Sequence, residues 1–167
     1  MFIRSERLVI TELSMDMCSD IQKNSLDEDN RRFVPDEVFE TYEEAEKRLK
    51  WLIASYKSSN GPFVYPIIIN DNVNIGYVQA CPIKEGYEIG YHIAKKYTGN
   101  GFATEAIRVF LPEIMTSLGI NKIYGIVLEE NAASYKVLEK CGFKLTYKGV
   151  GKYQGVERAI RRYIFEQ

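Results

Sequence analysis

The stretch KKYTGNGFATEA, residues 95–106, places two glycines around one asparagine, directly before a segment typical of a helix. Glycine in regular structure costs roughly 0.5 to 1 kcal/mol relative to alanine, so its use here indicates a tight turn or a close ligand. Unsatisfied N–H groups and the positive end of the dipole make a helix N-terminus favourable for an anion such as phosphate. The stretch therefore predicts a phosphate-binding loop, and a loop merely shaped by its glycines is the alternative.

Two other phosphate-binding loops fit this stretch poorly. A Walker loop is excluded because no Gly-Lys-Ser or Gly-Lys-Thr follows the glycines. The dinucleotide fingerprint requires a third small residue, and that position holds Thr104, followed by Glu105. The glycine spacing alone therefore does not name the ligand.

Three predicted strands lead into the glycine loop. Residues 63–70, 73–83 and 87–94 are rich in β-branched and aromatic side chains, and residues 70–72 and 84–86 have the composition of hairpin turns. We expect three consecutive antiparallel strands, the last of which ends at the loop.

A helix is predicted directly after the loop, beginning at Phe102 or Ala103. Pro112 lies inside it and removes one backbone hydrogen bond, so we expect a kink or a break near residues 108–112. Apolar residues recur at helical spacing along one stripe until Gly119 ends the helix: Ala103, Ile107, Phe110, Ile114 and Leu118.

The other segments complete a pattern of alternating strands and helices. Near the N-terminus, residues 7–13 alternate as in a half-buried strand, and the capping box of Thr41 and Glu44 begins a helix that ends near 58–62. After residue 119 we expect a strand at 122–128, a helix from Asn131 through Cys141 ended by Gly142, and strands at 143–150 and 158–165 joined across 152–155. This order predicts a mixed sheet covered by helices.

Composition restricts the class of protein. The chain has 167 residues and is 46% hydrophobic, which fits one domain spanning residues 1–167. A net charge of −1 with dispersed lysine and arginine argues against a nucleic-acid surface. Three cysteines without a CxxC motif and a single histidine predict neither a disulfide framework nor a metal site, which favours a reducing cytosol. No signal core or run of about 18 apolar residues is present, so we expect a cytoplasmic protein without a membrane partner.

Two motifs resemble those of the GNAT N-acetyltransferase superfamily. Residues 96–101 are similar to its acyl-CoA-binding signature, Q/R-x-x-G-x-G/A, with Lys96 in place of glutamine or arginine. NAASYKVLEKCGF, residues 131–143, resembles the second motif, a helix that begins at asparagine and ends in Gly-Phe. SERLVITEL, residues 5–13, is similar to the first strand of the branch that includes RimJ/RimL-type ribosomal-protein N-terminal acetyltransferases.

The resemblance implies the fold in more detail. It implies a single-domain α+β fold, with a mostly antiparallel mixed sheet of about seven strands flanked by about four helices. The sheet should splay between the strands at 86–94 and 122–128.

The resemblance also implies acetyl-CoA as cofactor. Its pyrophosphate would be held by main-chain N–H groups from Tyr97 to Ala103, and its pantetheine arm would add to the strand edge at 93–95. The implied cofactor-binding residues are Ile93, Lys95, Lys96, Tyr97, Thr98, Gly99, Asn100, Gly101, Phe102, Ala103, Thr104, Asn131 and Ser134.

The implied reaction is direct acetyl transfer to a primary amine in a ternary complex. It needs a neutral amine, a stabilised oxyanion and a leaving thiolate. We expect Glu88 to act as the base and an N–H near Ile93 to bind the oxyanion; a solvent-facing glutamate is the alternative, and His92 is a competing base. Ser134 is the candidate acid.

Two further residues of the second-motif helix bear on this assignment. Many relatives carry a tyrosine as the acid at the position of Leu138, so the sequence departs from the family pattern there. Cys141 is interpreted as a packed helix residue because direct transfer needs no nucleophile.

The acceptor amine is not defined by these motifs. Residues 15–40 should help to bind it, and acidic residues there would attract a cationic amine or simply be solvated: Asp27, Glu28, Asp29, Asp36 and Glu37. Phe33, Trp51 and Tyr91 either line the acceptor cleft or fill the core. A ribosomal-protein N-terminus, another peptide and a small amine all stay open, as does a homodimer. A non-catalytic acyl-CoA-binding module is the alternative function.

Overall fold

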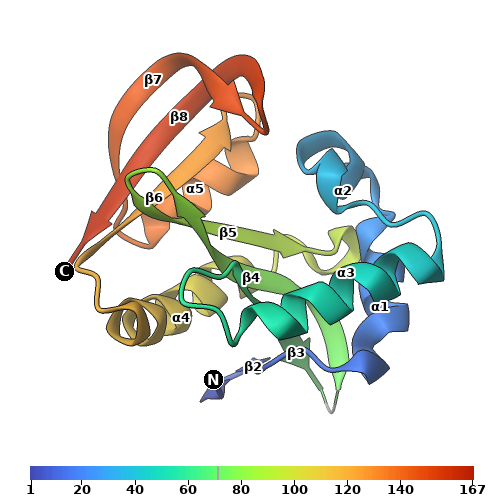
Figure 1. Ribbon diagram of the computed structural model, residues 1–167. Coiled ribbons are helices and arrows are strands. Elements are labelled where there is room, and N and C mark those ends of the chain that lie inside the picture. Colours follow the sequence, from blue (N-terminus) through green and yellow to red (C-terminus); the bar gives the residue numbers. More distant parts are fainter. Residues whose placement is uncertain (71) are drawn as a thin grey trace.

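The computed structural model describes residues 1–70 and 72–167 (Figure 1). In this part of the chain, eight strands form one sheet in the order β1-β2-β3-β4-β5-β6-β8-β7. The strands are β1 (Ile3–Arg4), β2 (Val9–Ile10), β3 (Phe63–Ile69), β4 (Val73–Ile83), β5 (Gly86–Ile93), β6 (Lys122–Leu128), β7 (Lys144–Tyr153) and β8 (Val156–Glu166). The helices are α1 (Cys18–Ser25), α2 (Glu28–Phe33), α3 (Tyr42–Ser55), α4 (Phe102–Leu118) and α5 (Ala132–Lys140), with short 3-10 turns at η1 (Met15–Met17), η2 (Pro35–Glu37) and η3 (Lys95–Tyr97).

The sheet is antiparallel except between β5 and β6, which run parallel. These two strands pair at one position, Glu88 with Tyr124, and then diverge (Figure 1). The predicted mixed sheet and its splay are therefore confirmed. The splay leaves the β6-facing edge of β5 unpaired toward its C-terminal end.

Helices cover both faces of the sheet. Successive residues of β3 point to opposite faces, and the residues on both faces are buried. On one face, Val64 packs with the apolar stripe of α3 and with Cys18 of α1. On the other face, Tyr65 packs against Phe110 of α4, with ring centroids 5.6 Å apart. The site between β5 and β6 is thus held by two packed layers.

Helix α3 has the predicted start. The hydroxyl of Thr41 accepts from the N–H of Glu44, and the carboxylate of Glu44 accepts from the N–H of Thr41, which completes the capping box. The predicted apolar positions Ala45, Leu49 and Leu52 are buried.

Helix α4 differs from the prediction at Pro112. The helix continues without a break from Phe102 to Leu118. Pro112 lies on the exposed side, where water can hydrate the freed carbonyl, while Leu111 and Ile114 beside it are buried in the core. Packing therefore keeps the helix continuous; of the expected kink or break near residues 108–112, the break was wrong.

The N-terminal strand is shorter than predicted. Of residues 7–13, Val9 and Ile10 are in strand β2, which pairs with an additional two-residue strand, β1. With that strand, the described residues contain eight strands rather than about seven, and α1 and α2 between residues 15 and 40 bring the helices in them to five.

The predicted hairpins are present. Strands β3 and β4 pair as far as Ile69 with Val73, although Asp71 of the predicted turn lies outside the described residues. Strands β7 and β8 extend further than expected and turn within 152–155, at Gln154 and Gly155. In the described ranges no helix has the length and apolar character needed to cross a membrane.

Candidate active site

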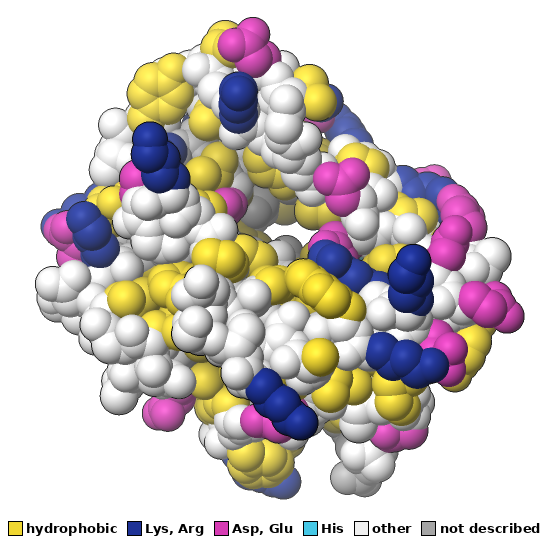
Figure 2. Space-filling view, in the orientation of Figure 1, with side chains coloured by type: hydrophobic (Ala, Val, Ile, Leu, Met, Phe, Trp, Pro, Cys, Tyr) yellow, Lys and Arg dark blue, Asp and Glu magenta, His cyan; other side chains and the backbone are white. Residues whose placement is uncertain are grey.

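A cleft of about 590 Å³ opens where β5 and β6 diverge. Its walls come from β4, β5, β6, the glycine loop before α4, the first turns of α5 and the tip of the β7–β8 hairpin. Figure 2 shows this face of the molecule hollowed between the part that carries α5, β7 and β8 and the part that carries α2. The cleft thus joins both predicted motifs and the region between residues 15 and 40.

The glycine loop leaves the N-terminus of α4 uncapped. Helices α2, α3 and α5 begin with side-chain caps from Asp27, Thr41 and Asn131, whereas Gly101 provides no side-chain cap to α4. The first N–H groups of α4, from Phe102 onward, are therefore available to an anion in the cleft.

The two glycines of the loop are required by backbone conformation. Gly99 and Gly101 have φ angles of 79° and 80°, which side chains rarely adopt. A Cβ atom on Gly99 would meet no atom within 4 Å. Conformation rather than crowding therefore explains glycine at this position, and the space beside it is open for a ligand.

The free edge of β5 offers a main-chain donor at Ile93. The N–H of Ala94 donates to the carbonyl of Ile75 on β4, at 2.8 Å. Because successive N–H groups alternate between the two edges of a strand, the N–H of Ile93 points away from β4, to the edge that β6 leaves unpaired. An extended chain or an oxyanion can bind there.

Most residues expected at the cofactor line the cleft, but three do not. The lining set contains Ile93, Tyr97, Thr98, Gly99, Gly101, Phe102, Ala103, Thr104, Asn131 and Ser134. Lys95 lies outside it: its N–H donates to Asp27 at 3.0 Å, and its ammonium pairs with Glu28 at 2.9 Å. The ammonium of Lys96 lies over the Tyr97 ring, and the Asn100 side chain bonds within the loop.

Helix α5 presents its first turn to the cleft. The side-chain oxygen of Asn131 caps the helix by accepting from the N–H of Ser134, at 3.1 Å. The phenol oxygen of Tyr91 on β5 lies 2.7 Å from the carbonyl oxygen of Ser134 and 2.9 Å from its Oγ. Ser134 is thus fixed from both its own helix and the opposite strand.

Glu88 carries a half-buried carboxylate at the base of the splay. Burial raises its pKa to about 7, against the N–H of Ile126 and the charge of Arg162, which lower it. The group therefore titrates in the range where a general base for an amine is useful.

His92 lies two pleats along β5 from Glu88, and both side chains line the cleft. Its Nε2 is 3.2 Å from Oδ2 of Asp27, and burial lowers its pKa against the pull of that carboxylate. Both candidate bases therefore stay accessible to the cleft.

The acidic residues between 27 and 37 are mostly engaged within the protein. Asp27 caps α2 and binds Lys95, Glu28 pairs with Lys95, and Glu37 lies 2.7 Å from Arg48. Asp29 pairs with Lys95 at 3.5 Å and also lines the cleft. Attraction of a cationic amine by this cluster as a whole therefore has little support.

The tip of the β7–β8 hairpin meets α2 across the cleft. The hydroxyl of Tyr153 donates to the carbonyl of Phe33 at 3.1 Å, and Arg32 pairs with Glu130 at 3.3 Å. These contacts, which the sequence did not indicate, join separate parts of the chain around the cleft that Glu88 and His92 also line.

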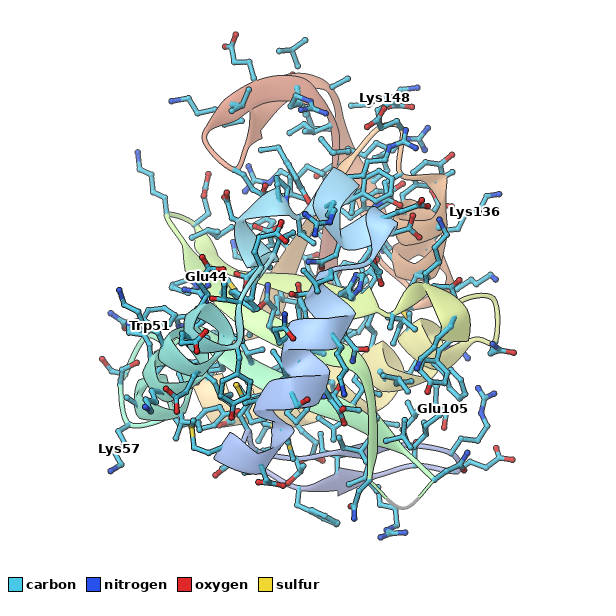
Figure 3. All side chains as sticks on the ribbon, turned by 90° about the vertical axis from the view of Figure 1, so that its right-hand side faces the viewer. Glu44, Trp51, Lys57, Glu105, Lys136 and Lys148 are labelled. Carbon is cyan, nitrogen blue, oxygen red and sulfur yellow. The ribbon has the colours of Figure 1, made fainter. Side chains whose placement is uncertain are left out.

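Three other residues named from the sequence lie away from the open cleft. Trp51 is exposed on α3, beneath Arg48, and points outward (Figure 3). Leu138 is fully buried against Gly125 of β6, so the position that holds a tyrosine in many relatives belongs to the core here. The Cys141 thiol is buried, which raises its pKa to about 11, and lies 3.6 Å from the carbonyl of Thr104, as expected for a packed residue.

Residues 7–144 match the family model described as an acetyltransferase (GNAT) domain. The chain belongs to the GNAT acetyltransferase family. Membership in this family makes it an acetyl-CoA-dependent acetyltransferase, in agreement with the resemblance found in the two motifs.

Known relatives of this GNAT chain agree with the assignment. The Bacillus subtilis protein named uncharacterized N-acetyltransferase YnaD is 26% identical over 147 residues, which is 86% of this chain and 83% of that protein. A GNAT-family acetyltransferase from Bacillus anthracis superposes with a TM-score of 0.84 at 23% identity, over 99% of this chain and 98% of its own. RimL, a ribosomal L7/L12 alpha-N-protein acetyltransferase solved with coenzyme A, superposes with a TM-score of 0.85 at 17% identity. The superposition covers 99% of this chain and 98% of the RimL chain. These structures show the shared fold.

Proposed function

We propose that residues 1–167 form one N-acetyltransferase domain that transfers the acetyl group of acetyl-CoA directly to a primary amine in a ternary complex. The cleft itself carries the proposal. An unpaired strand edge at Ile93, an uncapped helix N-terminus after Gly101 and a half-buried carboxylate at Glu88 all border it. These are a donor for an oxyanion, an anchor for a phosphate and a base for an amine.

The glycine loop fits the pyrophosphate of coenzyme A. Main-chain N–H groups between Tyr97 and Ala103 would hold the phosphates, and the open edge at Ile93 would hold the peptide-like pantetheine arm. Acetyl-CoA, when bound, supplies the activated acetyl group. The N–H of Ile93 would then stabilise the negative charge that develops on the carbonyl oxygen of the acetyl group.

Glu88 is the proposed general base. A carboxylate with a pKa near 7 is partly ionised at neutral pH and holds a proton more tightly than an ordinary glutamate. It would take the proton of the acceptor amine directly or through one water. His92 is the alternative base, although its imidazole already binds Asp27.

Ser134, in the first turn of α5, is the proposed general acid that donates a proton to the departing sulfur. A thiol with a pKa near the roughly 8.5 of cysteine leaves without full protonation, so this residue contributes less than Glu88. Its bond to Tyr91 orients its hydroxyl group.

The acceptor is a primary amine, and two classes fit the cleft. A peptide N-terminus, such as that of the ribosomal protein modified by RimL, and a small amine both present a slender group. The contact between Tyr153 and Phe33 joins two walls of the cleft and would favour a substrate slender enough to pass beside it. We place the reaction in the cytoplasm.

A non-catalytic acyl-CoA-binding module is the second candidate function. Leu138 favours it, because no phenol lies at the position where many relatives carry the acid. Turnover decides between the two functions.

The test is release of free CoA thiol from acetyl-CoA with a panel of peptide and small amines. We expect turnover by the wild-type chain and a loss of about 100-fold or more in Glu88→Gln. Glu157→Gln, at an exposed position of β8, is the matched control and should keep full activity. Tight CoA binding without thiol release for every amine would overturn the proposed catalysis and favour the binding module.

A further inference from the structure

Arg7 lies in the turn between β1 and β2 and reaches the glycine loop from outside the cleft. Its Nη1 donates to the carbonyl oxygen of Asn100 at 2.9 Å. Its Nε and Nη2 lie 2.7 and 2.6 Å from Oε2 of Glu105 on α4. Its guanidinium carbon is 4.7 Å from the centre of the Phe102 ring. One side chain thus touches three residues at the start of α4.

The bond to Asn100 fixes the orientation of a peptide unit. The carbonyl of Asn100 and the N–H of Gly101 belong to the same planar trans peptide, so they point in opposite directions. When Arg7 holds the carbonyl, the N–H of Gly101 points away from Arg7. Gly101 has φ of 80° and lines the cleft, whereas Arg7 is not among the lining residues.

Glu105 makes this arrangement rigid. Its Oε1 accepts from the hydroxyl of Ser5 at 2.8 Å and from the N–H of Arg7 at 3.0 Å, in addition to the guanidinium contacts. Figure 3 shows Glu105 on the side of α4 that faces the N-terminal strands. Burial alone would raise the pKa of Glu105, but these hydrogen bonds hold it below its ordinary value. The carboxylate therefore stays ionised and neutralises Arg7.

We propose that Arg7 is a positioning residue for cofactor binding: it holds the Asn100–Gly101 peptide so that the loop N–H groups are presented to a pyrophosphate. This inference rests on the proposed cofactor site. Because Glu105 compensates its charge, Arg7 acts through the shape of the loop rather than as a phosphate ligand. The turn at residues 5–7, far from the glycine motif in sequence, becomes part of the cofactor site.

The test measures CoA binding by calorimetry for the wild-type chain, Arg7→Gln, Arg7→Lys and Arg4→Gln. We expect Arg7→Gln to weaken CoA binding about tenfold, and Arg7→Lys nearly as much, because lysine cannot reproduce the forked contact to Asn100 and Glu105. Arg4→Gln is the matched control, since Arg4 is exposed and makes no side-chain contact of this kind with the described residues. It should bind CoA like the wild type.

Steady-state kinetics separate positioning from general damage. In Arg7→Gln the KM for acetyl-CoA should rise about tenfold, while kcat and the KM for the amine change less than about twofold. The amide signal of Gly101 in an NMR spectrum should shift in this variant. Glu105→Gln is a second variant with the same expected pattern, should Arg7→Gln fold poorly.

Several outcomes would overturn the inference. Wild-type affinity in Arg7→Lys would mean that Arg7 acts as a charge, and wild-type affinity in Arg7→Gln would mean that it has no role. A wild-type chain that does not bind CoA would overturn it together with the proposed function. CoA binding that depends on Arg7, without turnover of any amine, would support it and reject only the proposed catalysis.

Discussion

The phenol oxygen of Tyr91 lies 2.7 Å from the carbonyl oxygen of Ser134 and 2.9 Å from its hydroxyl. The carbonyl can only accept, so the phenol donates to it, and in the contact between the phenol and the Ser134 hydroxyl either oxygen can be the donor. Tyr91 is on β5 and Ser134 on α5, so this contact links the two halves of the sheet where their strands no longer pair. The width of the cleft is therefore fixed by side chains.

Tyr91→Phe tests this link. The variant loses both part-buried hydrogen bonds and should be destabilised by about 1 to 2 kcal/mol, because each such bond contributes on the order of 1 kcal/mol. It should also lower kcat, since the Ser134 hydroxyl is no longer oriented. Thermal unfolding and kinetics of Tyr91→Phe, Ser134→Ala and the double variant measure the coupling. Fully additive effects on kcat would contradict a shared role.

The pH dependence of turnover should report Glu88. If its carboxylate accepts the proton of the amine, kcat/KM rises with pH and levels off above about 7, the pKa of this buried group. The assay should use an acceptor amine with a low pKa, so that ionisation of the amine does not contribute to the profile near pH 7. In Glu88→Gln the rise should disappear with such an acceptor. A profile unchanged by the substitution would point to His92 or another base.

Glu88 should also make stability depend on pH. Its pKa is about 7 in the folded chain and near its ordinary value of 4.5 when unfolded, so the folded state binds more protons between these values. The contribution of Glu88 to the free energy of unfolding is therefore fully present below pH 4.5 and is lost as the pH rises through 7. The loss is at most about 3 kcal/mol.

Urea unfolding at pH 5 and pH 8 checks this sign. Glu88→Gln cannot ionise, so its stability relative to the wild type should be greater at pH 8 than at pH 5. Glu157→Gln should follow the wild type at both values. If the wild-type chain instead gained stability relative to Glu88→Gln as the pH rises from 5 to 8, Glu88 would not be buried as described.

The part of the site that the sequence could predict is local. The glycine loop, the start of the helix that follows it and the Asn131 cap each depend on residues within a few positions of one another, and the structure contains all three. The capping box of α3 was predicted for the same reason.

The part that could not be predicted depends on contacts between distant segments. Arg7 and Glu105 are separated by 98 residues, and no local pattern couples them. The place of Lys95 in the motif predicts a cofactor-binding residue. In the structure, however, its N–H donates to the carboxylate of Asp27, which lies 68 residues earlier in the chain. The burial that shifts Glu88 likewise depends on how β6 and the C-terminal hairpin close around it, which strand alternation does not reveal.

Gly101 offers the most direct test of the loop. Its φ of 80° is unfavourable for a β-branched residue, whereas a Cβ atom there would meet only Nη2 of Arg7, at an ordinary 3.5 Å. Gly101→Val should therefore force the loop out of its conformation without disturbing the core. We expect CoA binding to be abolished and the thermal unfolding temperature to fall only slightly.

Gly101→Asn is the matched variant, because asparagine tolerates the left-handed conformation at a smaller cost. If loop conformation is what binds the cofactor, this variant should keep most of the CoA affinity that valine removes. Equal loss in both variants would mean that space above Gly101 matters more than its φ angle. Unchanged affinity in Gly101→Val would contradict the assignment of the glycine loop to the pyrophosphate, because the N–H groups could then not be the anchor.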